Sequence, residues 1–348
     1  MNTSDIYILA IESSCDDTSA SVLKNDTVLS NIVATQKIHE EFGGVVPELA
    51  SRAHQQHIVV VVGEALRESG ITKKDLSAIA FTQGPGLVGS LVVGASFSKA
   101  LAMALGIPLI AVNHMEGHVL AHLINDGSPI PHFPFLCLTI SGGHTQIVHV
   151  EGPRKMAVIG TTIDDAAGEA FDKTAKILGL PYPGGPLIDK YAQLGNSKAM
   201  TFSKPKISGL DYSFSGLKTS ILYTLQKLQK ENPKYIEEHL NDICASVQYS
   251  ISEILYKKLI EASKQLNIKN IAIAGGVSAN SFIRSELVRL GKLHNWNTFI
   301  PQFQYCTDNA AMIGISSYYQ YLAKEFSEQN VSPKARMPVG LKYSVGEN

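Results

Sequence analysis

This chain of 348 residues has few cysteines, no large excess of charge of either sign and no long uninterrupted apolar run. Four scattered cysteines are too few for a disulfide framework or a cysteine-based zinc site. Charged residues make up 18%, and 30 basic residues balance 31 acidic ones, so bulk charge does not predict a nucleic-acid partner. Hydrophobic residues, at 45%, exclude a disordered chain and supply a large core. The length predicts about two domains.

The sequence contains no recognisable export signal or membrane span. No basic region precedes the apolar run Ile6–Ile11, which ends at Glu12 and is typical of a strand. The longest apolar stretch, Leu91–Val112, is interrupted by serine, lysine, glycine and proline, and it predicts a helix followed by a strand. We therefore expect a cytoplasmic protein with no membrane association.

Strands and helices alternate along the chain, which favours an α/β fold. The opening segments Ile6–Glu12 and Thr18–Lys24 predict a strand, a polar turn and a second strand. The same pattern returns over Phe135–Ile140 and Thr145–Val150, which indicates a duplication displaced by about 130 residues.

The stretch between 125 and 131 is rich in Asp, Gly, Ser and Pro and predicts a linker. We expect a first lobe over 1–125, a second lobe over 131–325 that carries nucleotide-binding loops, and a tail over 326–348. Two such lobes would hold a nucleotide in a cleft between them.

Two histidines are spaced as ligands of one metal ion. His114 and His118 lie four residues apart and share a face of the helix expected there. Glu116 points elsewhere, unlike the glutamate of the metalloprotease signature, which directly follows the first histidine. Asp308 is a candidate third ligand. Surface histidines, and a helix N-cap at Asp308, are the alternative interpretations.

Glycine-rich turns follow two of the expected strands. Ser141–His144 joins two strands, and residues 274–280, with the sequence AGGVSAN, join a strand to a helix. Loops at the carboxyl ends of strands bind nucleotides in α/β folds, although a plain hairpin turn explains the first one equally well. Asn280 either contacts a ligand or begins the following helix.

Two further features have more than one interpretation. Carboxylates in segments 164–173 and 183–189 lie near a Gly-Gly turn, where they could hold ribose hydroxyls or simply face solvent. Lysines and aromatic residues alternate between 198 and 234, as in RNA-binding surfaces, but an ordinary exposed segment is favoured there.

Ten segments between residues 11 and 314 together resemble one family. They are IESSCDDTSASV, GGVVPELASRAH, GPGLVGSLVVGA, NHMEGH, ISGGHTQ, DDAAGEAFDK, YPGGP, DYSFSGLKT, AGGVSAN and CTDNAAMIG. The chain resembles the tRNA N6-adenosine threonylcarbamoyltransferase family (bacterial TsaD type), formerly called O-sialoglycoprotein endopeptidases. This resemblance implies the duplicated actin/Hsp70/sugar-kinase (ribonuclease H-like) fold.

The resemblance also implies a metal site and an adenylate site. His114, His118 and Asp308 resemble the ligands of one Fe²⁺ ion per subunit, with Zn²⁺ as the rival metal. The other site residues resemble contacts to the adenylate: Thr139, Ile140, Ser141, Gly142, Gly143, Asp172, Gly185, Asp189 and Asn280. No general base is assigned, although His144 and Glu12 are candidates.

The implied activity is that of an acyltransferase. The family transfers the threonylcarbamoyl group of L-threonylcarbamoyl-AMP to N6 of adenosine 37 in tRNAs that read ANN codons, and AMP is released. Bacterial members work with an inactive structural sibling and a P-loop ATPase, so both are expected partners beside tRNA. A metal-dependent peptidase and a small-molecule kinase of the same superfold are the alternatives.

Overall fold

The computed structural model describes residues 5–205 and 207–340 and divides into two compact units. Unit 1 holds the residues up to 130, residues 150–157 and the residues from 308 onwards. Unit 2 holds residues 131–149 and 158–307. The predicted tail beyond 340, the first four residues and Lys206 lie outside the described residues.

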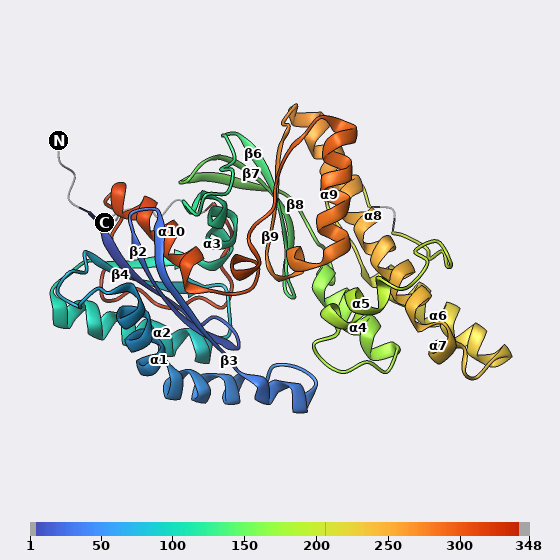
Figure 1. Ribbon diagram of the computed structural model, residues 1–348, viewed down its shortest axis with the longest axis horizontal. Coiled ribbons are helices and arrows are strands. Elements are labelled where there is room, and N and C mark those ends of the chain that lie inside the picture. The colour runs from blue at the N-terminus through green and yellow to red at the C-terminus, as the bar shows by residue number, and fades with distance from the viewer. Residues whose placement is uncertain (1–4, 206, 341–348) are drawn as a thin grey trace. The chain divides into compact units, whose positions relative to one another are not determined.

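Unit 1 is built on a five-stranded mixed sheet in the order β3-β2-β1-β4-β5 (Figure 1). Its strands are β1 (Tyr7–Glu12), β2 (Asp17–Lys24), β3 (Thr27–Thr35), β4 (Ala78–Gly84) and β5 (Leu109–Asn113). β1 pairs antiparallel with β2 and parallel with β4, which in turn is parallel to β5. The parallel strands β1, β4 and β5 are almost wholly buried, because helices cover both faces of the sheet.

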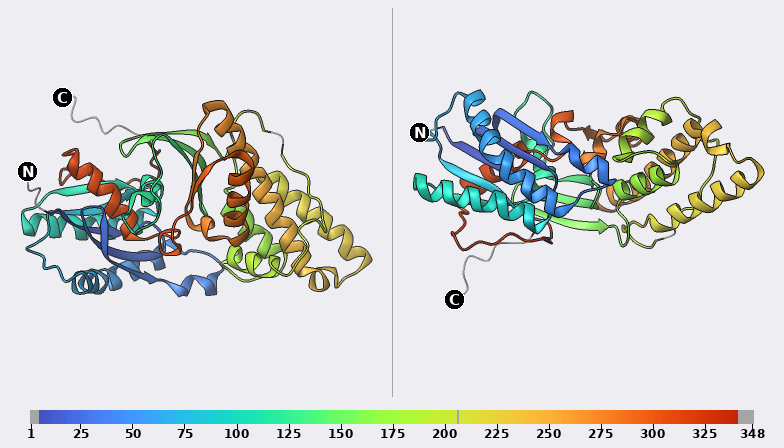
Figure 2. Two further views of the ribbon diagram at one scale, coloured as in Figure 1. Left: turned by 45° about the horizontal axis from the view of Figure 1, so that its top comes forward. Right: turned by 90° about the horizontal axis from the view of Figure 1, so that it is seen from below.

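The helices of unit 1 are α1 (Pro47–Ser69), α2 (Val88–Leu105), α3 (His114–Leu120) and α10 (Ala310–Leu322), with the 3₁₀ helices η1 (Lys37–Phe42) and η2 (Ala121–Leu123). α1 and α2 cover one face of the sheet, and α10 lies against the other (Figures 1 and 2). Leu9, Ile11 and Phe81 of the sheet and Ile58 of α1 are among the buried side chains of this core.

Unit 2 repeats the same arrangement of strands in the order β8-β7-β6-β9-β10. These strands are β6 (Phe135–Ile140), β7 (Thr145–Gly152), β8 (Lys155–Thr161), β9 (Asn270–Ala274) and β10 (Asn297–Phe299). The first strand of each repeat, β1 or β6, lies at the centre of its sheet and pairs parallel with the fourth. The predicted duplication is therefore visible as two sheets with one connectivity.

Several helices pack around the second sheet. They are α4 (Ala167–Ile177), α5 (Gly184–Ala192), α6 (Ser215–Glu231), α7 (Tyr235–Glu238), α8 (Leu240–Leu266) and α9 (Ser281–His294), with the 3₁₀ helices η3 (Gly276–Ala279) and η4 (Phe303–Tyr305). Phe171, Tyr212 and Phe214 are among the largest fully buried side chains of this core.

The contacts divide the chain differently from the predicted ranges 1–125, 131–325 and 326–348. The chain returns to unit 1 at Asp308, so that α10 packs on β1 and β2. The packing is tight, because a Cβ atom on Gly314 would lie 2.1 Å from a methyl group of Leu23. No proline- or glycine-rich linker marks this return, and the sequence therefore gave no sign of it.

Candidate functional site

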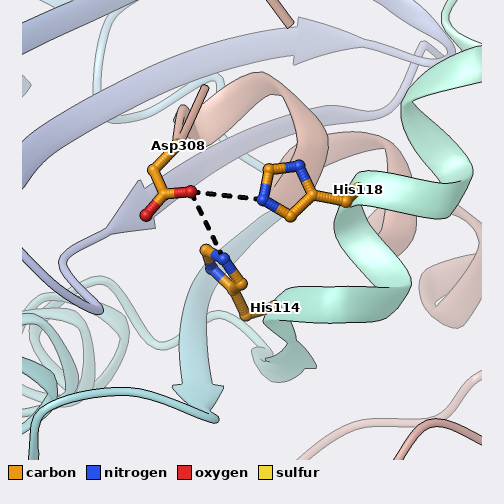
Figure 3. A group of neighbouring side chains, drawn as sticks. All are labelled: His114, His118 and Asp308. Atoms are coloured by element: carbon orange, nitrogen blue, oxygen red, sulfur yellow. Dashed lines mark hydrogen bonds and ion pairs between the residues drawn. The ribbon is translucent and has the colours of Figure 1, made fainter. Parts of the chain in front are cut away.

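The three predicted metal ligands lie together in unit 1 (Figure 3). His114 and His118 belong to α3, and Asp308 lies just before α10. Asp308 Oδ1 is 3.4 Å from His114 Nε2 and 3.2 Å from His118 Nε2. One donor atom of each residue lies within 4.8 Å of the others. The fold thus joins side chains that are 190 residues apart in the sequence.

We call His114, His118 and Asp308 the trio. Asparagine side chains cap α3, which carries the two histidines, and α10, which follows Asp308. Asn113 Oδ1 accepts hydrogen bonds from the backbone N–H groups of Met115, at 2.9 Å, and Glu116, at 3.3 Å. Asn309 Oδ1 accepts one from Met312 N at 3.0 Å. Asn309, and not Asp308, is therefore the N-cap of α10, and the carboxylate of Asp308 faces the histidines instead.

The carboxyl ends of three parallel strands supply the groups around His114. Glu12 ends β1, Thr82 belongs to β4, and His114 directly follows β5. Glu12 Oε2 lies 3.2 Å from His114 Nδ1 and also accepts a hydrogen bond from the Thr82 hydroxyl. Ser14 N donates to Glu12 Oε1 at 2.6 Å. A carboxylate on Nδ1 orients the ring so that Nε2 faces Asp308.

From the sequence alone, Glu12 is a candidate only for a general base. The feature that points to a role for Glu12 in the site is its position. A polar residue at the carboxyl end of a central parallel strand lies where α/β folds bind their ligands. Ser14 and Thr82 were missed altogether. Serine and threonine are common residues, and only the pairing of the strands brings these two to Glu12.

The trio is an electrostatically coupled group. Burial lowers the pKa of His114, but Asp308 and Glu12 together raise it by more, and it lies well above its ordinary value. Burial also lowers the pKa of His118, which stays below its ordinary value. Burial raises the pKa of Asp308, but the two histidines lower it by more. The two neighbouring carboxylates therefore favour a proton on His114 when no metal ion is bound.

The donor set fits a divalent transition metal. Two imidazole nitrogens and one carboxylate oxygen form the arrangement that non-haem Fe²⁺ sites use, and Zn²⁺ accepts the same donors. The His118 side chain is fully buried, whereas the Asp308 side chain is 27% exposed. Ligands could therefore enter on the side of Asp308. A bound cation would take the place of the proton, because metal ligands must be deprotonated.

Glu116 is turned away from this chemistry, as its spacing predicted. Its Oε1 accepts a hydrogen bond from Gly340 N at 3.0 Å, and its Oε2 lies 3.3 Å from Arg154 Nη1. A carboxylate held by these two partners is not placed to activate a metal-bound water. The geometry therefore disfavours the alternative of a metallopeptidase.

A cavity of about 400 Å³ lies in unit 2, within the size range of small-molecule sites. Five of the residues that the resemblance implies as adenylate contacts line it: Gly142, Asp172, Gly185, Asp189 and Asn280. Phe171, Pro183, Pro186 and Val277 add apolar walls. The lining comes from five places in the sequence, which are the segments after β6 and β9, the segments around α4 and α5, and Thr307.

Hydrogen bonds fix the polar groups of this cavity. Asp172 Oδ1 accepts from Gly184 N at 2.9 Å and from Gly185 N at 3.1 Å at the start of α5. Burial raises the pKa of Asp172, while these two amides lower it. Asp189 accepts from Ser281 N at 2.9 Å and so ties α5 to α9.

Asn280 begins α9 and lines the cavity at the same time. Its Oδ1 accepts from Ile283 N at 3.0 Å, and its Nδ2 donates to Gln248 Oε1 at 2.8 Å. The interpretation of Asn280 as the start of the helix is therefore confirmed, and its contact with a ligand stays a prediction. The preceding Gly275 has a φ of +87°, and a Cβ there would lie 2.5 Å from Ile140 O, which explains a glycine at this turn.

The other four predicted adenylate residues are not in the cavity lining. Thr139 and Ile140 are buried in β6, and the Thr139 hydroxyl donates to Gln146 O at 3.3 Å. Ser141 N donates to His144 O at 2.8 Å, which closes the turn. Gly143 is exposed at the tip of that turn.

The lysine-containing segment between 198 and 234, which we call the basic stretch, exposes few aromatic side chains. Phe202, Tyr212 and Phe214 are core residues of unit 2, and Tyr223 is the exposed one. Lys204 pairs with Glu253. The alternation of lysine and aromatic residues thus reflects a segment that packs its rings inward, as the favoured interpretation expected.

Comparisons of sequence point to one family. A profile described as tRNA N6-adenosine threonylcarbamoyltransferase matches residues 27–315. Proteins with this name are similar to the chain over nearly all of both lengths. The one from Christiangramia forsetii is 61% identical and covers 97% of this chain and 99% of its own. The one from Porphyromonas gingivalis is 55% identical, with 96% and 99% covered.

Comparisons of structure concern the fold alone. HypF from T. kodakarensis matches 93% of this chain and 50% of its own, with a TM-score of 0.63 and 13% identity. Component A of (R)-2-hydroxyglutaryl-CoA dehydratase from Acidaminococcus fermentans matches 91% and 99%, with a TM-score of 0.51 and 15% identity. Together with the repeated sheets, these likenesses confirm the duplicated α/β fold class.

Proposed function

The chain belongs to the tRNA N6-adenosine threonylcarbamoyltransferases, and on that premise we propose its reaction in detail. The substrate is L-threonylcarbamoyl-AMP, and the acceptor is N6 of adenosine 37 in tRNAs that read ANN codons. The N6 amine attacks the carbamoyl carbon and loses a proton. A carbon–nitrogen bond forms, the carbon–oxygen bond to phosphate breaks, and AMP leaves.

The cavity of unit 2 is the proposed adenylate site. Its apolar walls suit the flat faces of a base, and Asp172 and Asp189 offer carboxylate oxygens to ribose hydroxyls. Gly142 and the neighbouring residues Thr139, Ile140, Ser141 and Gly143 are proposed on the phosphate side. Backbone N–H groups of such a turn steady the charge that grows on a leaving phosphate.

The trio is the proposed metal site. Its set of two imidazoles and one carboxylate is the observation that most strongly supports the proposed function. His114, His118 and Asp308 would hold one Fe²⁺ ion, or Zn²⁺ in its place. A bound ion would act there as a Lewis acid and polarise a carbamoyl or phosphate oxygen. Glu12 orients His114 rather than acting as a base, since its oxygens are already engaged. No residue is assigned as general base.

The outer face of α1 and α2 is the proposed surface for the structural sibling. The exposed large apolar side chains on these helices are Val59, Val60, Val88, Val92 and Met103. α1 and α2 pack side by side, so a related protein could bury this face against its own two helices. A P-loop ATPase is proposed as the further partner.

We place the protein in the cytoplasm and away from membranes. Within the described ranges, α2 is the one helix long and apolar enough to cross a bilayer. It packs against α1 and β4, and 39% of it is buried, so length and composition are weak evidence for a span.

The test is reconstitution with tRNA, threonine, bicarbonate and ATP, together with the enzyme that makes the adenylate and the two partner proteins. Nucleoside mass spectrometry is expected to find threonylcarbamoyladenosine at position 37. Absence of the product, where an authentic transferase succeeds in the same mixture, overturns the proposal. Cleavage of a glycoprotein by the metal-loaded chain would instead support the peptidase alternative.

A further inference from the structure

Glu116 lies between the two histidines of α3 in sequence, yet it takes no part in the trio. Its side chain is 5% exposed, and both of its oxygens have partners from distant segments. Gly340 N donates to Oε1 at 3.0 Å, and Arg154 Nη1 donates to Oε2 at 3.3 Å. A buried carboxylate with two such partners is costly to leave unpaired, so these contacts hold α3 in place.

The partner Gly340 ends a segment that we call the C-terminal strap, residues 327–340. The strap belongs to unit 1, and its backbone is hydrogen-bonded to β4 and β5. Ser327 N donates to Leu109 O at 2.7 Å, and Lys334 N donates to Gln83 O at 2.7 Å. Met337 is buried. The strap thus follows β4 and β5 to the point where α3 begins.

The strap reaches α3 at two places. Pro338 O accepts a hydrogen bond from Asn113 Nδ2 at 2.9 Å, and Gly340 N donates to Glu116. Asn113 is the residue whose Oδ1 caps α3, so the strap also fixes the rotamer of the cap. α3 has only seven residues. A helix this short has little stability of its own, and its orientation is set by such contacts.

Arg154 joins α3, which carries the two histidines, to the segment that follows α10. Its Nη1 donates to Glu116 on α3, and its Nη2 donates to Glu325, which follows α10, at 2.5 Å. Asp308 precedes α10, whereas the histidines belong to α3. One guanidinium, with its rigid set of N–H donors, therefore links α3 to the segment that follows α10.

We propose that Glu116 is a positioning residue for the metal trio, which acts by binding the C-terminal strap and Arg154. The inference rests on the proposed metal role of His114, His118 and Asp308. Its consequence is that the geometry of the trio depends on residues 337–340, which lie more than 200 residues from α3 in sequence (the bond from Gly340 spans 224).

The test measures Co²⁺ affinity, and the visible absorption of bound Co²⁺, in chains stripped of metal. Glu116→Ala removes both contacts and is expected to weaken Co²⁺ binding by about tenfold or more, as changes around metal ligands do. Glu116→Gln keeps an acceptor for Gly340 N and should lie between Ala and the wild type. A chain that ends at Arg336 lacks the end of the strap and should match Glu116→Ala.

Two controls separate this role from general stability. A chain that ends at Gly340 keeps every contact described and should bind Co²⁺ as the wild type does. Glu151→Gln removes an exposed carboxylate that pairs with Lys155 beside Arg154, and it should also have no effect. Combining Glu116→Ala with the truncation at Arg336 should weaken binding by less than the product of the two separate effects, because both changes remove the contact between Gly340 and Glu116.

Variants that melt earlier but bind Co²⁺ with wild-type affinity and spectrum would overturn the inference. If Glu116→Ala does not fold, the same Co²⁺ measurements on Arg154→Met and on the chain that ends at Arg336 take its place. Wild-type affinity and spectrum in both would then overturn the inference. A wild-type chain that binds no Co²⁺ overturns the proposed metal centre itself, which keeps the two failures distinct.

Discussion

Glu12 Oε2 lies 3.2 Å from His114 Nδ1, on the side of the ring opposite to Asp308. This contact decides which nitrogen of His114 is available to a metal ion. A carboxylate that accepts from one ring nitrogen fixes the tautomer and makes the other nitrogen a better ligand. The chain thus prepares its proposed metal site through a residue that does not itself belong to the trio.

Glu12→Gln is therefore expected to weaken metal binding by about tenfold to a hundredfold while the fold is kept. The amide preserves the size of the side chain but removes the charge that holds the Nδ1 proton. Competition for Zn²⁺ with a chromophoric chelator measures the effect. Glu64→Gln, an exposed change on α1, is the control. Equal affinity of Glu12→Gln and the wild type would contradict the role assigned to Glu12.

Asp17 should make the metal-free protein less stable at alkaline pH. Burial raises the pKa of Asp17 from 3.8 to about 7, and its Oδ1 has no hydrogen-bond partner among the described residues. The folded chain therefore holds this proton more tightly than the unfolded chain does. The stabilisation is complete below about pH 4 and is lost as the pH rises through about 7.

Asp17→Asn should accordingly raise the melting temperature by a few degrees at pH 8 and change it little at pH 4. Three pKa units set a ceiling of about 4 kcal/mol, and partial solvation reduces the expected gain to about 1–2 kcal/mol. Fluorescence of Trp296, the one tryptophan, follows unfolding of unit 2, and calorimetry follows the whole chain. The same gain at both pH values would refute the assignment.

The apolar face of α1 and α2 should be needed for complex formation and not for folding. Val60→Glu and Val92→Glu place charges on exposed positions, so the melting temperature should stay within a few degrees of the wild type. Both changes should weaken binding of the structural sibling by tenfold or more, because a charge would be buried in the interface. Calorimetric titration measures this. Undiminished binding would place the partner elsewhere.

Arg284 should matter for adenylate affinity although it is not in the cavity lining. Its Nη1 donates to Ser278 O at 3.3 Å, its Nη2 donates to Pro301 O at 2.9 Å, and its guanidinium stacks 4.2 Å from the centre of the Phe303 ring. It thereby joins the loop at η3 to the segment that ends at the cavity residue Thr307.

Arg284→Lys retains the charge but loses the fork and the stacking, so we expect AMP affinity to fall by about tenfold. Arg289→Lys, on the same helix but exposed and paired with Glu286, should leave it unchanged. Titration of AMP monitored by calorimetry distinguishes the two. A result in which both variants bind AMP equally well would show that the η3 loop does not depend on Arg284.

The sequence predicted the parts of this molecule that depend on local spacing. The pair His114 and His118 follows from helical periodicity, and the repeated strand–turn–strand pattern follows from alternation. Asp308 is one candidate third ligand among others until the family resemblance singles it out, because nothing local links positions 118 and 308. The return of α10 to unit 1 and the role of Glu12 depend on how strands pair, which one sequence does not state.

The basic stretch and Glu116 show the same limit in another form. Lysine and aromatic residues alternate between 198 and 234, but packing decides that Phe202, Tyr212 and Phe214 are buried. The spacing of Glu116 predicted only that it faces away from the histidines. Its partners, Gly340 and Arg154, are brought to it by tertiary structure.

The most direct test is to measure bound metal and threonylcarbamoyladenosine formation together in His114→Ala and the wild type, in the reconstituted system. The account predicts that the wild type carries Fe²⁺ or Zn²⁺ and modifies tRNA, whereas His114→Ala, still folded by calorimetry, loses both the metal and the product. Normal tRNA modification by a metal-free His114→Ala chain would contradict it.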